Sequence, residues 1–177
     1  MNPIFFLAGA PAVGKSTAAR ALAAKFPKSM HISVDTLRDM VISGAIHPSG
    51  DWSPGLVEQL SLARASAMQM AISYNQAGFV VIIDDFWDPH GRLLEYSPLF
   101  QEPNVYKILL LPSRQAAEER NRKRAGNEGE YHAEGIRMIY DHLQNEHINL
   151  KSQGWIIVDT TEKSIESTVE HIRAQVN

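Results

Sequence analysis

The chain has 177 residues, 44% of them hydrophobic and 21% charged, and a formal net charge of −3. This length suits one domain with a proper core. The negative charge argues against stable nucleic-acid binding through bulk electrostatics and leaves nucleic acid only as a transient substrate. The sequence has no cysteine, which excludes disulfides, cysteine-bound zinc, iron–sulfur clusters and a thiol nucleophile.

The sequence carries no sign of a targeting or membrane-spanning segment. The apolar run near the N-terminus, within MNPIFFLAGAP, lacks the basic residues that open a signal peptide. No apolar stretch approaches the roughly 20 residues that a bilayer-spanning helix needs. We therefore expect a cytoplasmic protein that does not bind membranes.

Short apolar runs alternate with longer segments of helical pattern. The runs are rich in Val, Ile and Phe with little polar alternation, which is typical of parallel strands buried on both faces. They predict strands at Pro3–Leu7, Met30–Val34, Phe79–Ile83, Val105–Leu111 and Trp155–Val158.

The segments between the strands predict helices, at Lys15–Lys25, Asp35–Ser43, Leu56–Ala77, Ser113–Lys123, Ala133–Asn145 and Ser164–Gln175. Two polar segments, Ile46–Pro54 and Gly126–His132, predict loops. Strands that alternate with helices indicate an α/β fold, with a five-stranded parallel sheet covered by helices on both faces. No linker divides the chain, so we expect residues 1–177 to form a single domain.

A phosphate-binding motif follows the first expected strand. Residues 9–16 read GAPAVGKS and match G-x-x-x-x-G-K-[ST], the P-loop. The glycines let the backbone N–H groups point at phosphate oxygens, and the next helix adds its positive N-terminal dipole. We expect Lys15 to contact the β- and γ-phosphates of ATP and Ser16 to bind Mg²⁺. The expected nucleotide-binding residues of this loop are Gly9, Ala10, Pro11, Ala12, Val13, Gly14, Lys15, Ser16 and Thr17.

An acid and an arginine follow the second expected strand. Asp35 and Arg38 lie three residues apart, on one face of the expected helix. At the carboxyl edge of the sheet, a carboxylate can accept the proton of a hydroxyl that attacks the γ-phosphate. Arg38 can orient the acceptor or hold an anionic group on it. The alternative is an ordinary helix-capping aspartate with an ion pair one turn on.

An acid pair ends the third expected strand. Apolar residues followed by an acid are typical of the Walker B element, whose carboxylate binds Mg²⁺ directly or through water. We place the metal at Asp85, because side-chain alternation would turn Asp84 the other way. The sequence leaves the choice between the two acids open, and an acid pair in an ordinary turn is the alternative.

The helix after the fourth strand ends in a cluster of cations. Residues 119–124 read ERNRKR, and Arg120 and Arg124 share a helix face. We expect a lid over about residues 120–135 that closes on the nucleotide, so that both arginines bind ATP and Arg124 neutralises the transferring phosphoryl group. A solvated basic helix end is the alternative, and it describes Arg122 and Lys123. The seven histidines show no ligand spacing, so we assign them no role.

The chain resembles polynucleotide-kinase-type P-loop kinases across most of its length. The resemblance rests on GAPAVGKST, VDTLR, IIDDFWDP, and ERNRKR followed by IRMIYDHL. In that family the Asp of the D-x-x-R element is the general base, its Arg contacts the acceptor phosphate, and lid arginines bind ATP. The resemblance therefore implies a base at Asp35, an acceptor contact at Arg38 and ATP contacts at Arg120 and Arg124.

The stretches VDTL, GFVVIIDDFW and VDTTEKSIES are similar to the chloramphenicol phosphotransferase family, which are small antibiotic kinases with an Asp base after the second strand. Zeta-toxin-like kinases of nucleotide sugars share the same core. The arginine lid favours the polynucleotide-kinase type. A pI near 6.1, and the absence of an attached phosphatase or ligase domain, favour a small-molecule acceptor.

We therefore expect an ATP- and Mg²⁺-dependent kinase that transfers the γ-phosphate to a hydroxyl of a small-molecule or nucleic-acid acceptor, in the manner of a polynucleotide 5′-kinase. One alternative is an antibiotic O-phosphotransferase. An alternative from another class is a P-loop ATPase switch without an acceptor. The expected catalytic residues are Lys15, Asp35, Arg38 and Arg124, and no pattern in the sequence indicates an oligomeric state.

Overall fold

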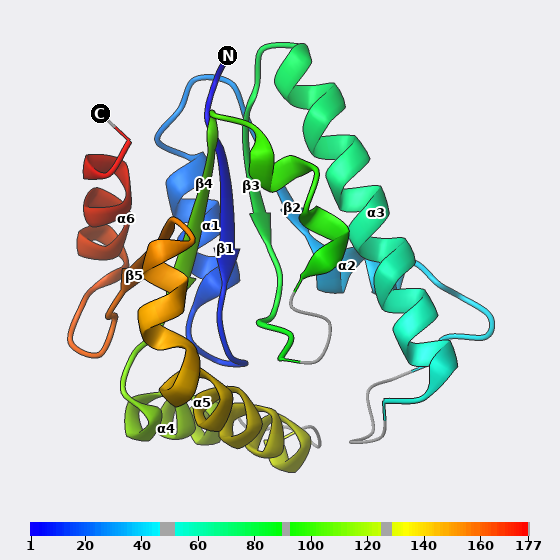
Figure 1. Cartoon of the computed structure of the whole chain (residues 1–177), viewed down its shortest axis with the longest axis vertical. Coiled ribbons are helices and arrows are strands. Elements are labelled where there is room, and N and C mark those ends of the chain that lie inside the picture. Colours follow the sequence, from blue (N-terminus) through cyan, green and yellow to red (C-terminus); the bar gives the residue numbers. More distant parts are fainter. Residues whose placement is uncertain (47–51, 90–92, 125–128, 177) are drawn as a thin grey trace.

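A five-stranded sheet forms the centre of the structure, in the order β2-β3-β1-β4-β5 (Figure 1). The computed structural model describes residues 1–46, 52–89, 93–124 and 129–176. All neighbouring strands are parallel, which confirms the predicted α/β fold with a five-stranded parallel sheet. The strands are β1 (Ile4–Ala8), β2 (Ser29–Ser33), β3 (Val80–Asp84), β4 (Val105–Leu110) and β5 (Trp155–Val158).

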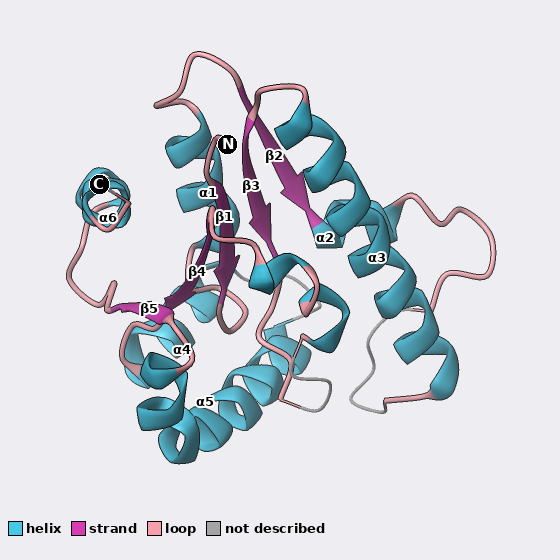
Figure 2. Cartoon of the chain, turned by 45° about the horizontal axis from the view of Figure 1, so that its top comes forward, coloured by secondary structure: helices cyan, strands magenta, loops and turns pink. Residues whose placement is uncertain are grey.

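Helices flank the sheet and connect its strands. In the view of Figure 1, α1 lies behind the sheet, and α5 runs below the lower end of the sheet and up beside β5. Figure 2 shows α3 beside β2 and β3, and it packs against both. The helices are α1 (Lys15–Ala23), α2 (Val34–Asp39), α3 (Pro54–Gln76), α4 (Arg114–Arg124), α5 (Gly129–Ser152) and α6 (Ile165–Ala174), with short 3-10 helices at Leu94–Tyr96 and Leu99–Gln101.

Two helices differ in length from the prediction. α2 ends at Asp39 rather than Ser43. Met40 and Ile42 are exposed, so no packing supports a longer helix. α5 begins at Gly129, so the expected loop through His132 is wrong over its last four residues, while its first residues lie outside the described part of the chain. Of the other expected loop, Pro54 already belongs to α3, and residues 47–51 are not described.

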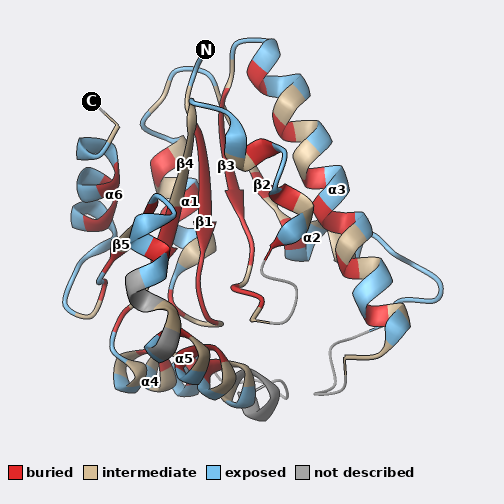
Figure 3. Cartoon of the chain, viewed as in Figure 1, coloured by how far each residue is buried: buried red, intermediate tan, exposed pale blue. Residues whose placement is uncertain are grey.

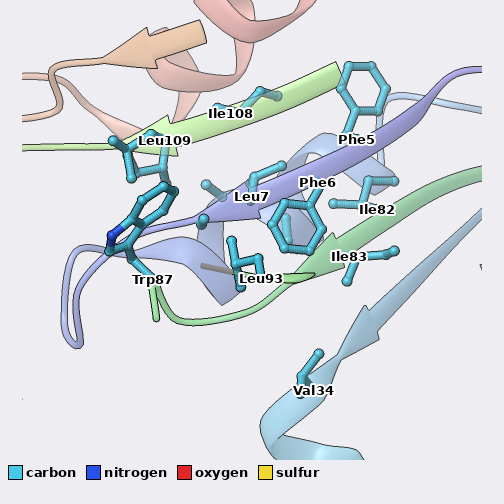
Figure 4. Packing of buried hydrophobic residues seen from close by; sticks show 14 of the residues in the cluster. Phe5, Phe6, Leu7, Val34, Ile82, Ile83, Trp87, Leu93, Ile108 and Leu109 are labelled. Atoms are coloured by element: carbon cyan, nitrogen blue, oxygen red, sulfur yellow. The ribbon is translucent and has the colours of Figure 1, made fainter. Parts of the chain in front are cut away.

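The core lies on both sides of the central strands. Every residue of β1 and of β3 is buried, as Figure 3 shows in red. Figure 4 shows side chains of β1, β3 and β4 packed together with Trp87, which follows β3. On one face, the ring of Phe6 lies 4.6 Å from that of Tyr96, and the ring of Trp87 lies 5.1 Å from that of Trp155, measured between centroids. These contacts fix the segment that leaves β3.

The pairing of β1 with β3 continues beyond the end of β3. Leu7 lies opposite Asp84 in the parallel register. The amide of Asp85 donates to the carbonyl of Leu7 at 3.1 Å, and the amide of Trp87 donates to that of Gly9 at 3.0 Å. The start of the phosphate-binding motif is therefore hydrogen-bonded to the segment that carries the acid pair.

A buried arginine ties α3 to the same segment. Arg64 is fully buried, and its Nε lies 2.7 Å from Asp85 Oδ2 while its Nη1 lies 2.8 Å from Asp88 Oδ2. Glu95 adds a longer contact at 3.4 Å, and the Phe86 ring lies 5.1 Å from the guanidinium carbon. Burial would lower the pKa of Arg64, but the facing carboxylates raise it, so the guanidinium stays charged.

Replacing Arg64 with Met is expected to lower the free energy of unfolding by about 3–5 kcal/mol, because Asp85 and Asp88 would stay buried without their cation. The matched control is Arg114→Met, because this surface arginine pairs with Glu118 while its side chain is 37% exposed. That change should cost about 0–1 kcal/mol. Urea denaturation followed by circular dichroism measures both. Equal losses in the two variants would contradict the structural role of the buried arginine.

Candidate functional site

The P-loop joins β1 to α1 and has the backbone shape that its glycines permit. Gly14 adopts a left-handed conformation with φ 97°, and Ala12 does so with φ 62°. A Cβ atom on Gly9 would lie 2.7 Å from the carbonyl oxygen of Leu110, closer than such atoms approach. The Lys15 ammonium donates to the carbonyl of Ala10 at 2.9 Å, so it already lies over the loop. These features are those of a loop that wraps phosphates.

Asp84, at the end of β3, makes hydrogen bonds to Ser16 after the P-loop glycines and to His31 on β2. Its Oδ2 accepts a hydrogen bond from the Ser16 hydroxyl, and its Oδ1 lies 3.0 Å from His31 Nε2. Burial would raise the pKa of Asp84, but the hydrogen bonds from His31 and Ser16, with the charge of Lys15, hold it below its ordinary value. An ionised carboxylate therefore lies beside the hydroxyl of Ser16, the second residue of α1.

Asp85, which we predicted to serve the metal with Ser16, points the other way. Its Oδ2 meets Arg64 at 2.7 Å and accepts from the Tyr96 hydroxyl at 3.3 Å, while its Oδ1 accepts from the Phe86 amide at 2.8 Å. Burial raises its pKa to about 6 even though Arg64 opposes the shift. The two acids diverge, as side-chain alternation predicts, but Asp84 rather than Asp85 faces the P-loop.

The side-chain oxygens of Ser16 and Asp84 are of the kind that Mg²⁺ takes as ligands. Mg²⁺ is usually held by one or two protein oxygens, with water and substrate phosphates completing its shell. Among the described residues there is no group of three or more His, Asp or Glu side chains that could hold a metal ion by itself. The oxygens of Ser16 and Asp84 therefore suit a Mg²⁺ ion whose shell water and phosphate oxygens would complete.

Asp35 and Arg38 lie at the start of α2, beyond the carboxyl end of β2. The alternative of a capping aspartate does not apply, because Ser33 occupies the N-cap position. Asp35 is 71% exposed, and its Oδ1 lies 3.8 Å from Nη1 of Arg38, whose side chain is 16% exposed. This ion pair is long and leaves the carboxylate open to another partner.

Charged groups from three segments act on Lys15. Burial lowers the pKa of its ammonium, the carboxylates of Asp35, Asp84 and Asp85 raise it, and Arg124 lowers it, with a lowered value as the result. The structure therefore brings Asp35 and Arg124 within electrostatic range of the P-loop lysine, although they lie 89 positions apart in the sequence.

The two expected lid arginines differ in their surroundings. Arg120 Nη2 donates to the carbonyl of Thr160 at 2.6 Å and to that of Thr161 at 3.2 Å. Its Nη1 lies 3.4 Å from the carbonyl of Val13 in the P-loop. Arg120 is thus fixed between the P-loop and the turn after β5. Arg124 is exposed at the end of α4, next to residues 125–128, which are outside the described part of the chain.

Two residues of this region, His31 and Arg64, received no role from the sequence. His31 received no role because no ligand spacing involves it; its one signal is a place two residues before the end of the strand that neighbours the acid pair. Arg64 lies in the middle of a long helix among apolar residues, and a single charge in such a stretch was the available signal.

No helix within the described part of the chain has the length and apolar character needed to cross a membrane. No curated protein matches the sequence.

Known structures share this fold over nearly the whole chain. A tunicamycin resistance protein from Deinococcus radiodurans is 18% identical with a TM-score of 0.64, and covers 99% of this chain and 96% of its own. The shikimate kinase of Acinetobacter baumannii, in complex with shikimate, is 14% identical with a TM-score of 0.68, and covers 99% and 93%. A sugar kinase from Janibacter sp. HTCC2649 is 16% identical with a TM-score of 0.65, and covers 98% and 94%.

At such low identity these similarities establish the fold, which is an α/β P-loop fold with strand order 2-3-1-4-5. A family model described as an AAA domain matches residues 4–144, from β1 into α5 and across the whole P-loop. The chain therefore belongs to the AAA domain family AAA_33.

Proposed function

We propose that the protein is an ATP- and Mg²⁺-dependent kinase that transfers the γ-phosphate to a hydroxyl of a small-molecule acceptor. The observation that carries this proposal is that an exposed carboxylate, buried carboxylates and an arginine all lie within electrostatic range of Lys15 in the P-loop. Phosphoryl transfer depends mostly on positioning and charge stabilisation, and these groups supply both.

The P-loop residues Gly9 to Thr17 bind the phosphates of ATP, with Lys15 on the β- and γ-phosphates. Ser16 and Asp84 would hold Mg²⁺, in place of the pair of Ser16 with Asp85 that we expected. The Ser16 proton is already directed at Asp84, so the lone pairs of the hydroxyl oxygen stay available to a cation. When bound, the ion neutralises charge on the β- and γ-phosphates.

Asp35 is the general base of the proposed reaction. The acceptor hydroxyl loses its proton to Asp35 as its oxygen attacks the γ-phosphorus, and the bond from that phosphorus to the leaving oxygen of ADP breaks. Arg38 orients the acceptor from the next turn of α2. Arg124 contributes positive charge to the transferring group, and Arg120 contributes by holding the turn at Thr160 against the P-loop.

The acceptor we propose is a small molecule, and the whole chain acts as one kinase domain with a lid over about residues 120–135. The structural neighbours include kinases of shikimate and of a sugar, which supports a small hydroxyl compound. A phosphorylated or nucleic-acid acceptor of the polynucleotide 5′-kinase type is the second candidate, and the half-buried cation of Arg38 favours it. A P-loop ATPase switch is the third, and exposed Asp35 suits it less than a kinase.

The acceptor class is tested by measuring ADP formation with a panel of hydroxyl compounds: shikimate, sugars, nucleosides, amino-sugar and phenylpropanoid antibiotics, nucleotide sugars and 5′-hydroxyl oligonucleotides. We expect ADP formation to depend on one small-molecule class, with a product heavier by one phosphate in mass spectrometry. Stimulation by oligonucleotides alone would move the proposal to the second candidate. ADP formation that no acceptor changes would support the ATPase switch instead.

The roles of Lys15 and Asp35 are separated by their effects on turnover and on binding. Both Lys15→Ala and Asp35→Asn are expected to lower kcat by about 10²–10⁴-fold, because each removes a group that acts on the transition state. Only Lys15→Ala should greatly weaken ATP binding, measured by isothermal titration calorimetry. Asp39→Asn is the matched control, since this acid ends the same helix and is exposed. Turnover of Asp35→Asn equal to that of the control would refute the base.

A further inference from the structure

His31 makes the second hydrogen bond to the carboxylate that faces the P-loop. It lies on β2, next to β3, and its Nε2 lies 3.0 Å from Asp84 Oδ1 while its side chain is 14% exposed. Its partner Asp84 is 3% exposed and lies opposite Ser33 in the register of the two strands. Both side chains are thus carried by hydrogen-bonded neighbouring strands, so their backbones hold fixed positions.

The chemistry of the contact determines its direction. An ionised carboxylate only accepts hydrogen bonds, so Nε2 must carry the proton and donate it to Oδ1. The other oxygen, Oδ2, accepts from the Ser16 hydroxyl. Each oxygen of Asp84 therefore has one donor, and the two donors together set the rotation of the carboxylate about its Cβ–Cγ bond.

The two donors differ in what a metal would do to them. The Ser16 hydroxyl is itself a proposed metal ligand, so its oxygen would gain the ion as a partner while its proton stays on Asp84. The His31 contact comes from the opposite side, on a strand that carries no P-loop residue. It can therefore hold Asp84 in one orientation whether or not the ion is present. Ligating carboxylates generally depend on such outer hydrogen bonds.

Without His31, Asp84 Oδ1 would be a buried acceptor with no donor among the described residues. The charge of Lys15 already acts on this carboxylate and is one source of compensation. A turn of Asp84 toward Lys15 would draw it away from Ser16 and would occupy the ammonium that the phosphates need. The loss of one hydrogen bond would thus weaken two phosphate-binding elements at once.

We propose that His31 is a positioning residue for the metal–nucleotide complex: its Nε2–H fixes Asp84 toward Ser16 and keeps Lys15 free for the phosphates. The inference rests on the proposed function for its Mg²⁺ and nucleotide, and it does not depend on the identity of the acceptor.

The test compares two amides of different length at position 31. The side-chain nitrogen of Gln reaches about as far from the backbone as Nε2 of His, so His31→Gln keeps the donor. His31→Asn keeps the polarity but is too short to reach Asp84. The control is His171→Asn, at an exposed position on α6. The readout is the Kd of ADP and of a non-hydrolysable ATP analogue, measured by calorimetry with saturating Mg²⁺ and with a chelator.

We expect His31→Asn to lower the Mg²⁺-dependent gain in nucleotide affinity by about 10–100-fold, the usual effect of losing an outer-shell partner. The affinity measured with chelator should change less than the gain, and His31→Gln and the control should stay close to the unmodified protein. Circular dichroism melting establishes that each variant is folded. If His31→Asn does not fold, His31→Leu replaces it, since it keeps side-chain volume without a donor.

A second measurement separates positioning from simple packing. In the Asp84→Asn background, His31→Asn should cause little further loss of Mg²⁺-dependent affinity, because its effect passes through Asp84. Additive losses would overturn the proposal, as would an unchanged Mg²⁺ gain in His31→Asn or an equal loss in a folded His31→Gln. If the unmodified protein binds no nucleotide with Mg²⁺, the proposed function itself fails, which is a different result from a variant that matches the unmodified protein.

Discussion

The parallel pairing of β1 with β3 is the constraint on which the rest of the site depends. It does not stop at Asp84, because the amides of Asp85 and Trp87 continue to donate to carbonyls of Leu7 and Gly9. Gly9, the first residue of the P-loop, therefore takes part in the same series of backbone hydrogen bonds. On the other side, Gly9 lies so close to the Leu110 carbonyl at the end of β4 that no side chain fits. The phosphate-binding loop and the acid pair form one rigid unit.

Because their backbone is held in place, the adjacent acids Asp84 and Asp85 keep different partners and have pKa values shifted in opposite directions. Asp84 receives hydrogen bonds from Ser16 and His31, which hold its pKa below the ordinary value. Asp85, one residue on, is compensated by Arg64 from α3, and burial raises its pKa to about 6. Had both carboxylates faced the P-loop, their repulsion would have favoured protonation of one of them. Arg64 removes that competition by compensating Asp85 on the other side of the strand.

The sequence was informative where a pattern is local. Continuous apolar runs located every strand to within about a residue at each end, and the P-loop follows from spacing alone. The sequence could not tell which of Asp84 and Asp85 faces the P-loop, because alternation shows that adjacent side chains diverge but not which of them points toward a neighbouring strand. His31 and Arg64 could not be found this way, since their partners are 53 and 21 residues away and only the register of β2 and the docking of α3 bring them together.

Under the proposed function, the two arginines of α4 divide the work of the predicted lid. Arg120 makes contacts with Val13, Thr160 and Thr161, so the helix is anchored to the P-loop at this point. Arg124 follows one turn later, about 6 Å along the helix axis, and has no such anchor among the described residues. Under this proposal, Arg124 adds its charge from the end of α4 to that of Lys15. The fixed position of Arg120 thus places Arg124 one turn away and within electrostatic range of Lys15, where preorganised charge can act on a bound phosphate.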